Sequence, residues 1–284
     1  MIYDGRLSVF YYFSIIIRGD KMKKHTITGN VSIIRNFYLK ELGRKRKIWI
    51  YLPPEYEKSS ERYPVLYMHD GQNIFDEYTS FCGEWKVDEI LEDLYEKNTG
   101  KKVIIVAVDN GKKERLNEYS PWKSEINSYR IKRQGGLGDK YTDSIVYSLK
   151  PFIDKNYRTL KEDNGIMGSS MGGLISLYAS LKYPEIFKRV GVLSPAFWFA
   201  KKHFLNFIDK YDSEKDIKIF FYAGEKESEE DGLSEKYKND TSEFADILRK
   251  KGFDNINILF DKNGIHNESA WSQHFKEIFL WLYE

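Results

Sequence analysis

The chain has 284 residues, of which 31% are charged and 41% hydrophobic, so it is long enough to bury a full core. Its 45 basic and 43 acidic residues leave a net charge of +2, which gives no electrostatic basis for binding nucleic acid or an anionic membrane. The single cysteine, Cys82, excludes an intramolecular disulfide and fits a reducing compartment. We therefore expect a cytoplasmic protein, with secretion as the weaker alternative, and make no prediction of its oligomeric state.

The N-terminal residues include an apolar run over residues 9–17. This run is too short to span a bilayer, which takes about 20 residues, and its flanks do not match those of a signal peptide. Met22 followed by two lysines resembles a second start of the chain. We expect residues 1–24 to form a poorly ordered extension, of which residues 1–21 need not belong to the native protein, and residues 25–284 to form a single domain.

After residue 25, the first two apolar segments are predicted to pair as antiparallel strands. They cover residues 31–38 and 46–52 and are joined by a polar turn at Gly43. The basic cluster at residues 44–47 lies in this turn, where we expect it to be solvated.

The later apolar runs are continuous rather than alternating, which is typical of strands covered on both faces. These runs are residues 65–68, 103–108, 165–167, 190–193, 217–222 and 256–260. Amphipathic stretches lie between and after them, at residues 87–95, 141–153, 174–181, 242–248 and 275–282. This alternation predicts a mostly parallel sheet of about eight strands with helices on both faces. Ligands on such sheets bind at the carboxyl ends of the strands.

A G-x-S-x-G motif, residues 168–172, lies between a predicted strand and a predicted helix. In serine hydrolases of α/β architecture, this motif forms a strained turn that exposes the serine hydroxyl at the edge of the sheet. The same turn directs the following amide toward developing negative charge. The motif predicts Ser170 as the nucleophile and the Met171 amide as an oxyanion donor.

A serine nucleophile needs a base and an acid that orients the base, in the chain order serine, acid, histidine. His203 precedes the last two predicted strands, and His274 lies in the closing helix, so His266, in the loop after the last strand, is the predicted base. The acid is expected in the loop that follows residues 217–222. Glu225, Glu227 and Asp231 are its candidates.

The second oxyanion donor is expected in the loop that follows the third predicted strand. Gly71 permits unusual backbone angles there, so the amide of Gly71 or Gln72 is the candidate. The neighbouring His69 precedes the serine in the chain, and we interpret it as structural. The histidines lack metal-binding spacing and one cysteine cannot build a zinc site, so no metal or other cofactor is predicted.

Beyond the serine motif, further segments resemble the putative-esterase family of α/β-hydrolases. This family is related to esterase D and includes feruloyl and acetyl-xylan esterases and enterobactin-type siderophore esterases. The segments are YMHDGQN (67–73), RLNEYSPW (115–122), KPFID (150–154), GSSMGG (168–173), LSPAFW (193–198) and HNESAW (266–271). The resemblance covers nearly the whole chain and implies an α/β-hydrolase fold.

The resemblance also implies roles for particular residues. It places the acid at Glu227, in the G-x-x-[DE] position, where many relatives carry Asp. It implies that Trp122 and Trp198 line the substrate pocket, and that Arg115 and Glu118 form a structural pair.

The function predicted from these features is hydrolysis of carboxylic esters, of acylated carbohydrates or other small esters, through an acyl-enzyme on Ser170. The alternatives are a siderophore trilactone esterase and an acyltransferase of the mycolyltransferase type. A non-catalytic binding module is disfavoured because Ser170, Glu227 and His266 are all present.

Overall fold

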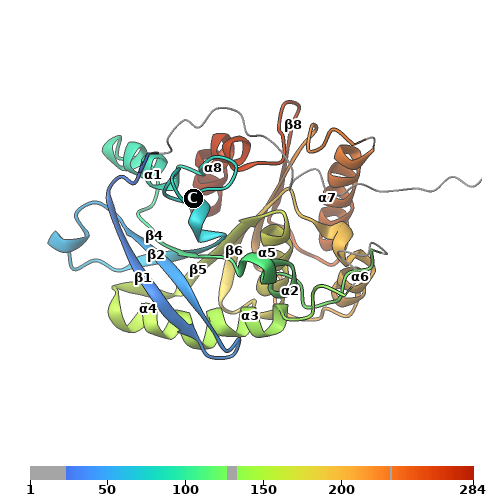
Figure 1. Ribbon diagram of the computed structural model, residues 1–284, viewed down its shortest axis with the longest axis horizontal. Coiled ribbons are helices and arrows are strands. Elements are labelled where there is room, and N and C mark those ends of the chain that lie inside the picture. Colours follow the sequence, from blue (N-terminus) through green and yellow to red (C-terminus); the bar gives the residue numbers. More distant parts are fainter. Residues whose placement is uncertain (1–23, 127–132, 231) are drawn as a thin grey trace, which may run out of the picture.

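The protein folds around a single eight-stranded sheet in the order β1-β2-β4-β3-β5-β6-β7-β8 (Figure 1). The computed structural model describes residues 24–126, 133–230 and 232–284, so all but the last residue of the expected extension 1–24 lies outside the described residues. The strands are β1 (Asn30–Leu39), β2 (Arg44–Leu52), β3 (Tyr63–His69), β4 (Ile104–Val108), β5 (Thr159–Ser169), β6 (Phe187–Leu193), β7 (Lys218–Gly224) and β8 (Ile256–Asp261). The pairings β1·β2 and β2·β4 are antiparallel, and the others are parallel. This confirms the predicted α/β-hydrolase sheet.

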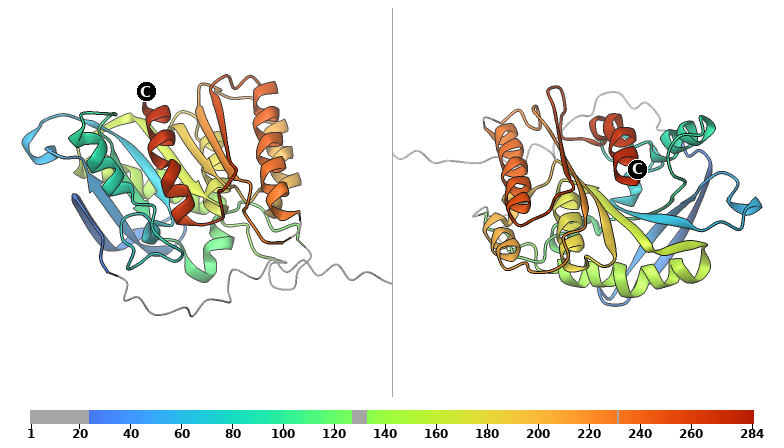
Figure 2. Two further views of the ribbon diagram at one scale, coloured as in Figure 1. Left: turned by 90° about the horizontal axis from the view of Figure 1, so that it is seen from above. Right: turned by 180° about the vertical axis from the view of Figure 1, so that it is seen from behind.

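Helices cover both faces of this sheet, as predicted (Figure 2). One face is covered by α1 (Val87–Glu96) and α8 (Glu268–Tyr283). The other is covered by α3 (Gly138–Ser144), α4 (Lys150–Asn156), α5 (Met171–Lys182), α6 (Lys201–Asp209) and α7 (Leu233–Lys250). The short helix α2 (Arg115–Glu118) contacts α3.

Burial on both faces explains why the strands are continuously apolar. In β3, Val65 and Tyr67 belong to the core on the α5 side, whereas Leu66 and Met68 belong to the core beneath α1 and α8. Successive side chains of a strand point to opposite faces, so a strand between two helix layers needs an apolar residue at every position.

The helix expected over residues 141–153 is part of a longer helical segment. Helix α3 continues through a π-helical turn, Ile145–Leu149, into α4. Proline at residue 151 lies in the first turn of α4, where its missing N–H is tolerated most easily.

The basic cluster at residues 44–47 is not a fully solvated turn, and this expectation was wrong. Arg44 and Arg46 belong to β2, and both guanidinium groups bind the carboxylate of Glu118 in α2. Glu118 is completely buried. Arg44 also forms an ion pair with Glu114, which is only half-buried. A buried carboxylate requires oppositely charged or hydrogen-bonding partners. The sequence pattern did not show that the partners of Glu118 are the arginines of the β1–β2 hairpin.

We expect Glu118→Gln to lower the free energy of unfolding by about 3 kcal/mol, because it leaves two arginines facing a neutral amide in a buried position. Glu114→Gln is the matched control: it removes the same charge from a half-buried partner of Arg44 and should cost less than about 1 kcal/mol. Urea unfolding of both variants measures the difference. Equal losses would show that burial of Glu118 is unimportant.

Candidate active site

The loops that carry the predicted site residues all leave the same edge of the sheet. In the register, Met68 of β3 pairs with Met167 of β5, and Ser169 pairs with Leu193 of β6. Leu193 pairs in turn with Tyr222 of β7, and Gly224 pairs with Asp261 of β8. The strands are parallel, so the loops that follow β3, β5, β6, β7 and β8 emerge side by side.

Ser170 occupies a strained turn between β5, which ends at Ser169, and α5, which begins at Met171. Its backbone angles are φ 58° and ψ −122°, a region that residues with a side chain rarely adopt. The Ser170 N–H donates to the carbonyl of Leu193 at 2.8 Å, and the Ser170 carbonyl accepts from Ala196 at 3.0 Å. A Cβ atom on Gly168 would lie 2.8 Å from the carbonyl carbon of Gly172, so the turn needs glycine there. The local structure is the one that the motif predicts.

His266 and Glu227 are hydrogen-bonded, with 2.6 Å between Nδ1 of the imidazole and Oε2 of the carboxylate. Glu227 is 1% exposed. The imidazole contacts two aromatic rings, with centroid distances of 5.0 Å to Tyr237 and 5.1 Å to Trp271. A carboxylate at Nδ1 favours the tautomer that carries its proton there, which leaves Nε2 as the basic nitrogen.

The second oxygen of Glu227, Oε1, accepts hydrogen bonds from the Ser194 hydroxyl at 2.5 Å and from the Gly224 N–H at 2.6 Å. Ser194 Oγ in turn accepts from the indole N–H of Trp271 at 2.9 Å. The carboxylate is therefore held on both oxygens in a site away from water. Sequence reasoning did not find the positions of Ser194 and Trp271 in this network, although both lie in segments that carry the family resemblance.

Of the other two candidate acids, the structure describes only Glu225, and its carboxylate is bound elsewhere. Glu225 Oε1 binds Lys238 Nζ at 2.5 Å. Asp231 lies outside the described residues. Among the described candidates, the structure brings only Glu227 to His266.

The loop after β3 lies against the Ser170 turn. A Cβ atom on Gly172 would be 3.3 Å from the Cβ of His69 and 3.4 Å from Oδ2 of Asp70. Asp70 has a left-handed backbone with φ 56°, and a 3₁₀ turn, Gly71–Asn73, follows it. A Cβ on Gly71 would come within 2.8 Å of the Val108 carbonyl carbon, which requires glycine at this position. Within the described part of the chain, the amides of Gln72 and Met171 donate no hydrogen bond, so both remain available to an oxyanion.

Asp70 forms a bidentate ion pair with Arg115, whose Nε donates to Oδ1 at 2.7 Å and whose Nη2 donates to Oδ2 at 2.8 Å. Asn110 donates a further hydrogen bond to Oδ1 at 2.7 Å. Burial alone would raise the pKa of Asp70, but Arg115 and Asn110 together hold that pKa below its ordinary value. The expected pair of Arg115 with Glu118 is wrong: Arg115 binds Asp70, and Glu118 binds the arginines of β2.

His69 is buried and belongs to an aromatic network beneath the same loop. Its Nδ1 lies 2.8 Å from the Tyr141 hydroxyl, and the Asp70 N–H donates to the Tyr119 hydroxyl at 3.1 Å. Burial lowers the pKa of His69 to about 3, so its imidazole is neutral at ordinary pH. This environment fits the structural role expected for His69.

Trp122 and Trp198 are each half-buried. Trp122 packs against Tyr178 and Phe204, with ring centroids 5.4 Å and 5.1 Å away. Trp198 packs on Phe199, and its indole N–H has no hydrogen-bond partner among the described residues. A pocket role for these two residues stays a prediction.

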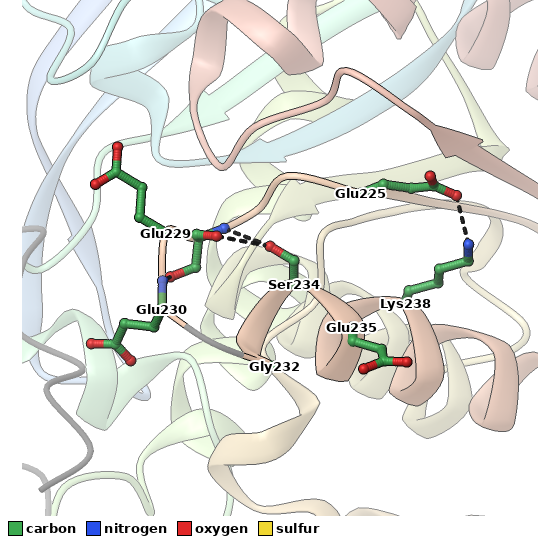
Figure 3. Close-up of a pocket in the computed structure, with 8 residues that line it drawn as sticks. Glu225, Glu229, Glu230, Gly232, Ser234, Glu235 and Lys238 are labelled. Carbon is green, nitrogen blue, oxygen red and sulfur yellow. Dashed lines mark hydrogen bonds and ion pairs between the residues drawn. The ribbon is translucent and has the colours of Figure 1, made fainter.

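A shallow pocket of about 390 Å³ lies beside the Glu227 loop and the start of α7 (Figure 3). Its lining residues are Glu225, Ser228, Glu229, Glu230, Gly232, Ser234, Glu235 and Lys238. Four glutamates against one lysine make this pocket acidic.

Comparison with known proteins gives the same architecture. The model of a family described as "Putative esterase" matches residues 40–282. The Bacillus subtilis protein YbbA is 27% identical over 243 residues, which cover 84% of this chain and 92% of YbbA. A xylanase/feruloyl esterase of Xylanibacter ruminicola is 26% identical over 213 residues, which cover 71% of this chain and 26% of that protein.

Solved structures of similar fold include two hydrolases. An IroE-like serine hydrolase from Shewanella oneidensis matches with a TM-score of 0.69 and 22% identity, over 90% of this chain and 79% of that one. The Shigella flexneri enterobactin esterase matches with a TM-score of 0.70 and 17% identity, over 92% of this chain and 60% of that one. In the described part of this chain, no helix has the length and apolar character needed to cross a membrane.

The ion pair between Asp70 and Arg115 predicts a pH-dependent stability. The pKa of Asp70 is lower in the folded protein than in the unfolded chain. Its contribution is therefore complete above the unfolded value of about 3.9 and disappears as the pH falls through the lower, folded value. We expect Asp70→Asn to lower the free energy of unfolding by about 3 kcal/mol at pH 7, because Arg115 loses its carboxylate.

Urea unfolding of wild type and Asp70→Asn as a function of pH tests this expectation. The difference between the two proteins should narrow as the pH falls below about 4. Asp93→Asn is the control, because the Asp93 carboxylate is solvent-exposed and its ion pairs among the described residues are with lysines; this substitution should change the free energy of unfolding little at any pH. A wild-type advantage that stayed constant down to about pH 2.5 would contradict the assignment.

Proposed function

Because this chain belongs to the putative-esterase family and is a carboxylic ester hydrolase by that membership, we propose that it is a serine esterase acting through Ser170, His266 and Glu227. The observation that carries this proposal is the hydrogen bond between His266 and the buried Glu227. It lies at the sheet edge from which the strained turn of Ser170 also emerges.

In the proposed mechanism, Nε2 of His266 takes the proton of the Ser170 hydroxyl as the serine oxygen attacks the ester carbonyl. Glu227 keeps the other proton on Nδ1 and stabilises the imidazolium that forms. The imidazolium then protonates the departing alcohol, which leaves an acyl-enzyme. Water hydrolyses the acyl-enzyme, with His266 again acting as the base.

The oxyanion formed in each step is proposed to bind the amides of Met171 and of Gln72 or Gly71. Two features support this assignment. The loop after β3 lies against the Ser170 turn, and the Gln72 and Met171 amides have no competing acceptor among the described residues. The ion pair of Asp70 with Arg115 holds the loop in place, so the donors are fixed before substrate binds.

The proposed substrates are small carboxylic esters, including acylated sugars and siderophore lactones. The xylanase/feruloyl esterase and the enterobactin esterase among the similar proteins support these classes by their names. A turnover panel of short-chain, feruloyl and acetylated-sugar esters, run beside a siderophore trilactone, ranks them by kcat/KM.

We expect Ser170→Ala to lower kcat by about 10⁴-fold or more on the best ester of that panel, since the attacking oxygen is removed. The variant should also lose labelling by a fluorophosphonate probe. Ser169→Ala, which changes the neighbouring serine at the end of β5, should still be labelled. A wild-type protein that the probe does not label would contradict the proposal.

We expect Glu227→Gln to lower kcat by about 10³- to 10⁴-fold with a small change in KM. An amide would place an N–H₂ donor at Nδ1 and favour the wrong tautomer of His266, while the other contacts of the side chain could persist. Glu225→Gln is the matched control and should stay close to wild type, because Glu225 binds Lys238 instead of the imidazole. Equal losses in the two variants would exclude a specific role for Glu227.

A further inference from the structure

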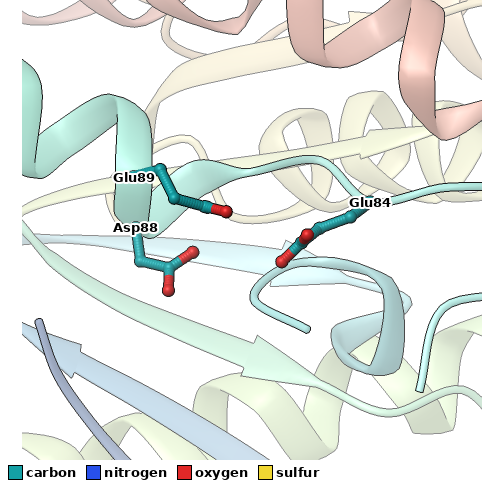
Figure 4. A group of neighbouring side chains, drawn as sticks. All are labelled: Glu84, Asp88 and Glu89. Carbon is teal, nitrogen blue, oxygen red and sulfur yellow. The ribbon is translucent and has the colours of Figure 1, made fainter. Parts of the chain in front are cut away.

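We propose that Glu84, Asp88 and Glu89 form a binding site for one calcium ion at the N-terminal end of α1. One oxygen atom from each carboxyl group lies within 4.8 Å of the other two. Figure 4 shows the three side chains converging from the start of α1 and from the loop before it. The site is distinct from the proposed esterase site, and nothing in the proposed mechanism uses it.

The converging oxygens are buried and lack partners. Glu84 is 3% exposed and Asp88 is fully buried. Oε1 of Glu84, Oδ1 of Asp88 and Oε2 of Glu89 have no hydrogen-bond partner among the described residues. A buried carboxylate oxygen without a donor is costly, so three directed at one another call for a shared positive ligand.

The opposite oxygens of the two most buried groups are already used. Thr26 Oγ1 donates to Oε2 of Glu84 at 2.9 Å, and the Thr28 N–H donates to Oδ2 of Asp88 at 2.7 Å. These contacts fix the rotation of each carboxylate, so that its remaining oxygen is held in the cluster. The orientation is therefore set by the fold before any ion binds.

No basic side chain within the described residues forms an ion pair with Glu84, Asp88 or Glu89. Burial makes the charge on these carboxylates costly, and no side chain in the described part of the chain offsets it by an ion pair. A divalent cation would supply the missing charge at neutral pH and also occupy the free oxygens.

The chemistry of the donors favours calcium over other divalent ions. All three are carboxylate oxygens, which excludes the nitrogen and sulfur set typical of zinc. Calcium binds oxygens at about 2.3–2.6 Å, so ligands on opposite sides of it are about 5 Å apart, which the cluster satisfies. Magnesium demands a near-ideal octahedron and usually keeps several waters, which suits three buried carboxyl groups less well.

Calcium titration of the full chain, dialysed against a chelator and held at about pH 8, tests the proposal. We expect calorimetry to show one calcium ion bound per chain and a rise of the melting temperature with calcium, since an ion that binds only the folded state stabilises it. Magnesium at the same concentration should raise the melting temperature less. A wild-type chain with neither heat of binding nor a rise would overturn the proposal.

The double variant Glu84→Gln/Asp88→Asn should lose the heat of binding and the calcium-dependent rise, whatever its own melting temperature. Glu229→Gln/Glu235→Gln removes the same charge from the acidic pocket beside α7 and should bind calcium as wild type does. Equal weakening in both would show adventitious binding to acidic surface and overturn the proposal. Should the first variant not fold, Glu89→Gln replaces it, because Glu89 is only half-buried; wild-type calcium affinity in that variant would equally refute the site.

Discussion

The buried carboxylate of Glu227 is the constraint on which the candidate site depends. An ionised carboxylate with 1% exposure is tolerated only where its oxygens are hydrogen-bonded. Two donors, the Ser194 hydroxyl and the Gly224 amide, meet at Oε1, which leaves Oε2 for His266. The position of the imidazole is thus set by how the acid is held.

The same constraint connects several parts of the fold. Ser194 follows β6, Gly224 ends β7, and Trp271, which donates to Ser194, belongs to α8. Their arrangement requires the parallel register in which Leu193 is opposite both Ser169 and Tyr222. A register shift of one residue in β6 would turn its side chains to the other face of the sheet and break the hydrogen bonds between Ser194, Glu227 and Trp271.

The sheet and its helices could be predicted from the sequence because the signals are local. Strands covered on both faces are continuously apolar, and a strand followed by glycines and an amphipathic helix marks the Ser170 turn. The ion pairs could not be predicted in this way. Arg115 and Glu118 are three residues apart on one short helix, yet their partners are Asp70 after β3 and the arginines of β2. Sequence spacing favours the local pair, whereas burial selects whichever opposite charge the tertiary structure brings within reach.

The candidate site residues also differ in whether a local sequence signal or a tertiary contact determines their position. Ser170 and its glycines are fixed by local backbone geometry, so the motif alone predicts them. Glu227, by contrast, lies in a run of acids, and only its contact with a residue 39 positions away separates it from Glu225. Ser194 and Trp271 are separated by 77 positions in the chain, and neither carries a signal of its own.

The proposed calcium site lies on the α1 side of the sheet, and the packing there reaches the candidate active site. Trp85 follows Glu84 in the chain, and its ring packs on Trp271 with centroids 5.8 Å apart. Trp271 contacts both Ser194 and the ring of His266. Nearby, the Asn73 side chain, from the turn after β3, donates to Glu268 at the start of α8. An ion that fixes the start of α1 would therefore restrain Trp85, and through it Trp271, on which His266 packs. Closely packed side chains transmit such a restraint because one ring cannot move without displacing its neighbour.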